Sequence, residues 1–150
     1  MSKKNNYFKD PKSLLWVIPI VLGSLLLLYF KYETTDTILI AENKITIEGT
    51  YGETIGFDEI KVITLSDSLP AIGGKSLAYA KGEVRKGYFK TSHRKRVKLI
   101  LNTNEKPYIY IKTIKNNQIY FSETGEKNKK LLDSIKKLIR IYNPNYHYFN

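Results

Sequence analysis

Cysteine is absent from this 150-residue chain, and methionine, tryptophan and histidine are scarce, with one, one and two residues respectively. Without cysteine there can be no disulfide framework, no thiolate nucleophile and no zinc site built on thiolates. The two histidines, His93 and His147, lie far apart in the sequence, and basic residues surround His93, where they would repel a divalent cation. We therefore expect no metal site and no cofactor.

Catalytic motifs are also lacking. The sequence has no GxSxG, no HExxH and no complete phosphate-binding loop. Residues 73–76, Gly-Gly-Lys-Ser, look like the end of such a loop but lack its first glycine at the required spacing, so we interpret them as part of a flexible loop. The acidic pair at 58–59 is more typical of a turn than of an acid–base pair. We expect a protein that is not an enzyme.

Acidic residues are also few: the chain has 14 Asp and Glu but 25 Lys and Arg, which gives a formal net charge of +11. This balance indicates an anionic partner, such as phospholipid headgroups, nucleic acid or an acidic polymer. The chain is 42% hydrophobic and 13% aromatic, which is too apolar for a disordered basic tail. Twelve tyrosines favour a sheet-rich domain over a helical bundle.

One long hydrophobic run stands near the N-terminus. Residues 14–30 contain no charge, and only Ser24 is plainly polar. As a helix this run would be roughly 25 Å long, close to the hydrocarbon core of a bilayer at about 30 Å. A cleaved signal peptide would need small residues after the run, and a core helix would need a polar face. Since both are missing, the run predicts an uncleaved, single-pass transmembrane helix.

The flanks of this run bear on its orientation. Residues 1–13 form a short leader with four lysines, whereas 31–47 carry two, so the positive-inside rule favours a cytoplasmic N-terminus with the domain outside. The positive charge of the domain argues the other way, because the cytoplasmic leaflet is the more anionic surface in many cells.

Beyond a linker at 31–36, turn signals separate short runs with the alternation of strands. The expected strands are 37–41, 44–49, 53–57, 61–65, 85–92, 96–102, 108–113 and 118–122, and 69–81 is expected to be a loop. From 126 to 142 apolar residues recur every three or four positions, which predicts one amphipathic C-terminal helix that Asn143-Pro144 ends. The fold class is mainly β with one C-terminal α-helix: a bent antiparallel sheet or barrel of seven or eight strands, followed by an aromatic tail at 143–150.

This order of strands and helix resembles the pleckstrin-homology-like (PH-like) fold, and four segments look like those of bacterial membrane-associated PH-like domains. They are 45–52 (ITIEGTYG), 55–60 (IGFDEI), 81–89 (KGEVRKGYF) and 107–111 (PYIYI). The resemblance covers roughly residues 37–141. It implies a PH-like domain at 37–142 preceded by a membrane segment, in a bacterial inner or plasma membrane, and it implies no catalytic residue and no defined ligand.

The positive charge is concentrated between Lys81 and Lys98, where eight basic residues meet Glu83 alone. If Phe89, Val97 and Ile109 point inward, strand alternation sorts the basic residues and tyrosines onto one outer sheet face, with Lys90 nearly opposite Lys98. The candidate anion- or lipid-binding residues on and beside this face are Lys86, Tyr88, Lys90, Arg94, Lys95, Arg96, Lys98, Tyr110 and Lys112; Tyr108 and Tyr120 are expected to be exposed beside them.

Two interpretations of this face stay open. It is either a solvated surface, as charge runs commonly are, or an anion-binding surface held near headgroups. The sequence favours a non-enzymatic, single-pass membrane protein that displays a PH-like binding or scaffolding domain and contacts anionic lipid headgroups or another membrane protein. The alternative is a structural subunit that binds a protein partner through a sheet edge or the C-terminal helix. No nucleic acid is expected as a partner.

Overall fold

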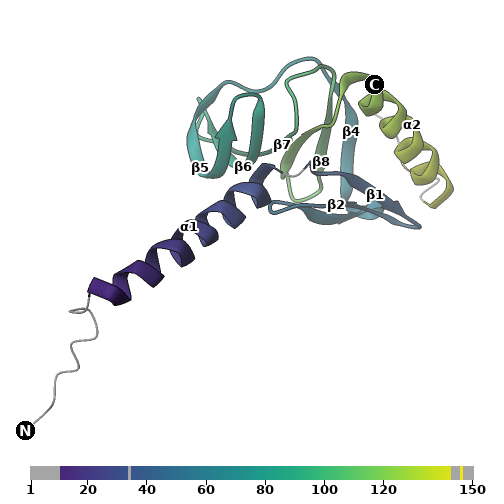
Figure 1. Cartoon of the computed structure of the whole chain (residues 1–150). Helices are drawn as coiled ribbons and strands as arrows, with labels where there is room; N and C mark the ends of the chain where they lie inside the picture. Colours follow the sequence, from purple (N-terminus) through teal and green to yellow (C-terminus); the bar gives the residue numbers. More distant parts are fainter. Residues whose placement is uncertain (1–10, 34, 143–145, 147–150) are drawn as a thin grey trace, which may run out of the picture. The chain divides into compact units, whose positions relative to one another are not determined.

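The computed structural model describes residues 11–33, 35–142 and 146 (Figure 1). The chain divides into two compact units, Met1–Thr34 and Thr35–Asn150. The first contains one helix, α1 (Pro11–Glu33), and the second contains nine strands and the helix α2 (Gly125–Tyr142) within the described residues. Residues 1–10 of the expected leader, and the expected aromatic tail apart from Tyr146, lie outside the described residues.

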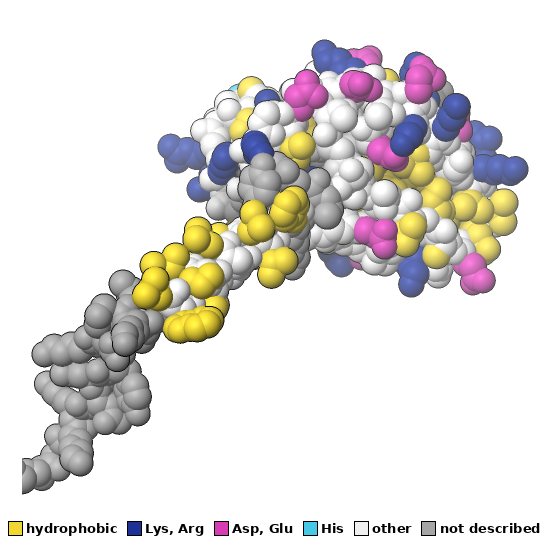
Figure 2. Space-filling model, viewed as in Figure 1, with side chains coloured by type: hydrophobic (Ala, Val, Ile, Leu, Met, Phe, Trp, Pro, Cys, Tyr) yellow, Lys and Arg dark blue, Asp and Glu magenta, His cyan; other side chains and the backbone are white. Residues whose placement is uncertain are grey.

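Helix α1 exposes apolar side chains in all directions. The four consecutive residues 15–18 are all exposed, and Trp16, Ile20 and Leu27 are at least 70% exposed. Figure 2 shows hydrophobic side chains along the described part of this helix. In the part of the chain that the structure describes, no helix is both long and apolar enough to cross a membrane. The transmembrane span predicted at 14–30 is therefore not found, although a helix is.

The Thr35–Asn150 unit contains two sheets. The first has the order β1-β2-β3 and is antiparallel, and the second has the order β4-β8-β9-β7-β6-β5. The strands are β1 (Ile38–Ala41), β2 (Lys44–Ile47), β3 (Glu53–Gly56), β4 (Ile60–Ser66), β5 (Ile72–Lys81), β6 (Val84–Thr91), β7 (Arg96–Leu101), β8 (Tyr108–Thr113) and β9 (Gln118–Ser122). The prediction of a mainly β fold with a C-terminal helix is confirmed.

Two details of the predicted sheet are wrong. Residues 69–81 were expected to be a loop, but β5 occupies most of them, pairs with β6 and brings the described strands to nine. Its two glycines weakened the strand signal, and two register shifts along the pairing absorb its irregular part. The sheet is also not wholly antiparallel, because β7 and β9 run in the same direction. The three predicted hairpins are confirmed, with the first turn at 42–43 as expected and the other two one residue earlier than the predicted 93–95 and 115–117, at 92–94 and 114–116.

The six-stranded sheet buries apolar residues on both of its faces. One face carries Ile100, Ile109 and Phe121, which pack with the first sheet and α2 into the larger core. The other carries Phe89, Leu99 and Tyr108 in a second core, against side chains from β5 and from the loop before it. Because both faces are occupied, alternation along a strand here separates two cores and does not separate core from solvent.

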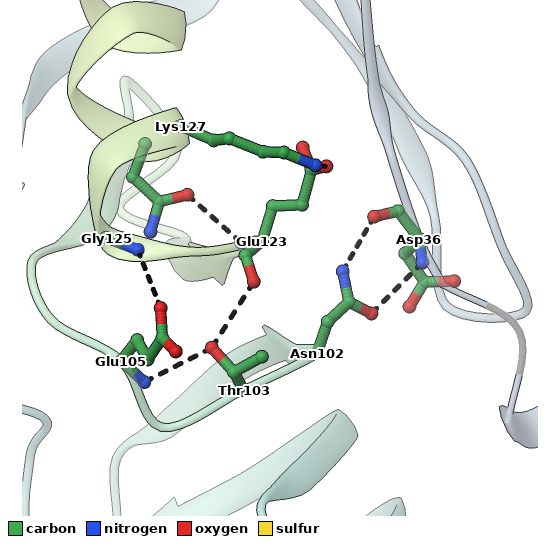
Figure 3. Close-up of polar contacts among 8 residues, drawn as sticks. Asp36, Asn102, Thr103, Glu105, Glu123, Gly125 and Lys127 are labelled. Atoms are coloured by element: carbon green, nitrogen blue, oxygen red, sulfur yellow. Dashed lines mark hydrogen bonds and ion pairs between the residues drawn. The ribbon is translucent and has the colours of Figure 1, made fainter.

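Helix α2 covers part of the larger core and lies beside β4 and β8 (Figure 1). Its apolar stripe buries Leu132, Ile135 and Ile139, as the period predicted. Its first turn is held by polar contacts, some of which Figure 3 shows. The fully buried Asn128 accepts a hydrogen bond from the Glu123 N–H (3.0 Å) and donates one to the Pro107 carbonyl (2.8 Å). These contacts tie the start of the helix to the loop before β8.

Candidate functional site

The expected single face of lysines and tyrosines does not exist, because the sheet places its members on opposite faces. Tyr88 pairs with Lys98 and Lys90 pairs with Arg96, so these four side chains share one face of β6 and β7. Lys98 in turn pairs with Ile119, which lies on the face of the larger core. Tyr110 pairs with Tyr120, on the face of the second core. The predicted pairing of Lys90 with Lys98 is wrong, because the hairpin is centred on residue 93 and not on 94, which puts Lys90 opposite Arg96.

On the second face of the sheet, the tyrosines that were predicted to be exposed are buried or half-buried. Tyr108 is buried, and Tyr110 and Tyr120 are half-buried with their ring centroids 4.9 Å apart. Burial raises the pKa of all three hydroxyls. Lys112, paired with Gln118, is half-buried on this face. Tyr110 and Lys112 are therefore separated by the sheet from the other candidate residues on β6 and β7.

Lys86 was expected to face solvent but is only 2% exposed. Its ammonium lies 2.9 Å from the carboxylate of Asp36, which is equally buried. Burial raises the pKa of Asp36 and outweighs the lowering effect of the Lys86 hydrogen bond and charge. Because the two charges pair with each other inside the domain, Lys86 is a structural residue and does not belong to an exposed anion-binding surface.

Asn102 and Gly49 restrict the position of Asp36. The side-chain amide of Asn102 donates to the Asp36 carbonyl (2.8 Å) and accepts from the Asp36 N–H (3.0 Å) (Figure 3). Gly49 has a φ of 109°, and a Cβ there would lie 1.7 Å from Oδ1 of Asp36. A glycine is therefore required on both conformational and steric grounds.

Lys98 was also expected to be exposed, yet it is 5% exposed and pairs with Glu53 of β3 at 2.8 Å. Tyr88 lies between the two cations of this face. The guanidinium carbon of Arg96 is 3.9 Å from the centre of the Tyr88 ring, and the Lys98 ammonium is 5.2 Å from it. Such stacking fixes a guanidinium while leaving its N–H groups available at the edge.

Four candidate residues remain exposed at the end of the β6–β7 hairpin, and we call them the basic turn: Lys90, Arg94, Lys95 and Arg96. Within the described residues, no carboxylate forms an ion pair with any of them. The turn is held by Thr91, whose N–H donates to the Lys95 carbonyl and whose hydroxyl accepts from the Lys95 N–H. Arg94 has a φ of 59°, which is unfavourable for a residue with a long side chain.

The β8–β9 turn repeats this geometry with different residues. Thr113 makes the equivalent hydrogen bonds to Asn117, and Asn116 has a φ of 62°. Asparagine tolerates this conformation better than arginine does. Because β7 and β9 are parallel neighbours, their first residues lie at the same end of the sheet, and the two turns therefore lie at that end together.

A hollow of about 180 Å³ lies at this end of the sheet. Its walls are formed by residues from four strands (β3, β6, β7 and β9) and the β8–β9 turn: Glu53, Tyr88, Arg96, Val97, Lys98, Asn117, Gln118 and Ile119. The sequence predicted Tyr88, Arg96 and Lys98 as site residues but gave no signal for Glu53, Asn117 and Gln118. Polar residues at a strand start or a turn carry no distinguishing pattern, and only the pairing of β7 with β9 brings them to the same place.

Other features of the domain give little chemistry. Two further hollows have volumes of about 660 and 600 Å³; Leu138 and Tyr142 of α2 line the first, and Phe89 lines the second. Among the described residues, no group of three His, Asp or Glu side chains could hold a metal ion. His93 is exposed in the basic turn region.

No known protein family, curated protein or solved structure matches this chain.

Proposed function

We propose that this protein is a non-enzymatic binding module whose PH-like domain is held at a membrane by α1 and contacts anionic lipid headgroups through the basic turn. The single observation that carries the proposal is the group of four exposed cations at one hairpin end, with no acidic partner among the described residues. A PH-like domain is supported by the strand-rich body that ends in one helix packed against β4 and β8.

The energetics of the basic turn favour a membrane as the partner. Each Lys or Arg close to an anionic leaflet contributes about 1 kcal/mol, so four contribute about 4 kcal/mol, or roughly a 1000-fold preference for an anionic surface. Helix α1 supports the same partner, because its exposed apolar side chains gain free energy when lipid covers them. The helix would also keep the domain near the surface and raise the effective concentration of headgroups.

The conformation of Arg94 supports a role for its charge. An arginine in the left-handed region costs about 1 kcal/mol more than the asparagine or glycine that such a turn accepts. The β8–β9 turn, with the same hydrogen bonds, places Asn116 at the equivalent position. A strained residue with an exposed side chain that forms no ion pair among the described residues is consistent with a function outside the domain.

The test uses the full chain reconstituted in vesicles of phosphatidylcholine alone or mixed with phosphatidylglycerol. Hydrogen exchange of the amides at 90–96 should be slower in the anionic vesicles than in the neutral ones, and added salt should remove the difference. The variant Lys90→Gln/Arg94→Gln/Lys95→Gln should lose the difference as well. Equal exchange of the unmodified chain in both vesicles would contradict lipid binding by this turn.

A matched control changes the same number of charges elsewhere on the domain. Lys61, Lys130 and Lys137 are exposed, and replacing all three by glutamine should leave the exchange difference at 90–96 intact. If the control variant loses the difference as fully as the turn variant does, net charge alone explains the binding and the basic turn is not the site.

The alternative function, a structural subunit that binds a protein through a sheet edge or α2, predicts the opposite response to salt. A partner held by packed apolar surface stays bound when ions screen the charges, whereas headgroup contacts weaken. Purification of the full chain from its native membrane at low and at high salt separates the two functions.

A further inference from the structure

We infer that the hollow beside the basic turn is a binding site for one phosphoryl group, carried by a lipid headgroup or by a soluble phosphate ester. The inference deepens the proposed anion-binding function and rests on it. The basic turn supplies diffuse attraction to a charged surface, and the hollow would supply one defined position for a single anionic group.

The balance of charge in the hollow selects an anion. Lys98 and Glu53 neutralise each other at 2.8 Å, with the Lys98 side chain only 6% exposed. This leaves Arg96 as the cation in the wall that no carboxylate of the described residues neutralises, and Lys90, its partner across the strands, stands on the same face. The site is therefore positive at its rim and electrically neutral at its base.

The donors are partly arranged before any ligand arrives. Arg96 is stacked on Tyr88 at 3.9 Å, so the plane of its guanidinium is set and less side-chain freedom is lost when its N–H groups bind oxygen. A planar guanidinium presents paired N–H donors that match the oxygens of a phosphate. Asn117, at the end of the β8–β9 turn, also lines the hollow, and its side-chain amide is a further donor.

The size of the hollow limits what it can accept. Its volume of about 180 Å³ is below the roughly 300–1000 Å³ of sites that hold drug-sized ligands or cofactors. It equals the liquid volume of about six water molecules. One phosphoryl group with its nearest substituent is therefore a better match than a nucleotide or an acyl chain.

The experiment titrates the full chain, in micelles of an uncharged detergent, with glycerol 3-phosphate, inorganic phosphate and, as a control anion, sulfate at matched ionic strength. We expect saturable NMR shifts of the side-chain N–H signals of Arg96 and Asn117 with the two phosphates. Arg96→Gln should weaken binding by about 10-fold or more, since hydrogen bonds to a charged group are lost. Arg96→Lys should weaken it too, because lysine keeps the charge but neither stacks nor presents paired donors.

Arg94→Gln is the matched control, because it removes one charge from the same hairpin outside the walls of the hollow. It should change the phosphate affinity by less than about twofold in high salt. The inference is overturned if the shifts do not saturate, if sulfate binds as tightly as phosphate, or if Arg94→Gln costs as much as Arg96→Gln.

Vesicles separate the two sources of phosphate and the two proposals. Protection of Asn117 by phosphatidic acid beyond that given by phosphatidylglycerol of equal surface charge would identify a lipid headgroup as the ligand, whereas binding of the soluble esters alone would identify a free phosphate. If phosphatidylglycerol vesicles protect the basic turn while no phosphate reaches Arg96 or Asn117, the inference fails and the proposed function stands. If phosphate fills the hollow while vesicle charge has no effect, lipid binding fails.

Discussion

The buried ion pair between Asp36 and Lys86 gives the sharpest test of how this domain is stabilised. Both side chains are 3% exposed and their charged atoms are 2.9 Å apart. We consider three variants: Lys86→Met, which leaves the carboxylate without its cation; Asp36→Asn, which leaves the ammonium without its anion; and the double variant, which removes both charges.

The magnitude follows from two opposing terms. At 2.9 Å and an effective dielectric constant of about 20, the attraction between the charges is about 6 kcal/mol. The cost of removing each ion from water is several kcal/mol, and the raised pKa of Asp36 indicates that this cost exceeds the attraction. Each single variant should therefore lower the free energy of unfolding by about 3–5 kcal/mol, while the double variant should stay within about 1–2 kcal/mol of the unmodified chain.

The pH dependence has a defined sign. A carboxyl whose pKa is raised by folding contributes stability below its usual value of 3.8, and this contribution is lost as the pH rises through the folded pKa. Without Lys86 the Asp36 carboxyl is more easily kept protonated. The loss of unfolding free energy caused by Lys86→Met should therefore be small near pH 4 and reach its full size at neutral pH. Asp36→Asn should not show this trend.

The assay is urea unfolding of the full chain in uncharged micelles, followed by the circular dichroism of the strands at several pH values. The reasoning is refuted if the double variant is as unstable as the less stable single variant, because the pair would then be a net source of stability. It is also refuted if Lys86→Met costs less than about 1 kcal/mol at neutral pH, which would mean that water reaches Asp36.

Three further predictions concern the turns, the start of α2 and acid stability. Arg94→Asn should raise the free energy of unfolding by about 1 kcal/mol and Asn116→Arg should lower it similarly, as urea titration measures; equal effects of one sign would show that the left-handed conformation is not the cause. Asn128→Ala should cost about 2–3 kcal/mol and speed hydrogen exchange in the first turn of α2, because it leaves a buried N–H and a carbonyl without partners; unchanged exchange there would contradict this. The hydrogen bond to Lys115 lowers the pKa of Glu59 from 4.5, so its stabilising effect is present above pH 4.5 and lost as the pH falls through the lower value. Glu59→Gln should make unfolding less sensitive to acid in thermal scans, and an unchanged acid profile would exclude this contribution.

Local patterns were sufficient for most of the secondary structure. The alternation at 108–113 and 118–122, the three hairpins and the apolar stripe of the C-terminal helix are short-range features, and each of them is present. The strand β5 was missed because Gly73 and Gly74 reduce strand propensity, while its hydrogen bonds to β6 are a tertiary property. The hydrophobic helix at the N-terminus was also evident from the sequence, because it depends on a continuous apolar run.

The candidate site was predicted less well, for a reason that the register makes clear. Strand alternation predicts that Lys98 and Leu99 point to opposite faces of the sheet, but it does not predict which face is exposed to solvent. In this domain, each face of the sheet packs against a hydrophobic core. Lys86 and Lys98 point into the protein and find Asp36 and Glu53, which are distant in sequence. No spacing rule predicts such partners.

By itself, then, the sequence determined the strand-rich domain, its closing helix, the apolar helix before it and the excess of positive charge, because each depends on composition or on neighbours a few residues apart. The tertiary structure alone decided which charges remain available. The parallel pairing of β7 with β9 brings two turns to one end of the sheet and forms the hollow beside Arg96. Burial of Lys86 and Lys98 leaves the basic turn as the exposed remainder of the predicted face, because a charge inside a protein must be matched there and cannot also bind a partner outside.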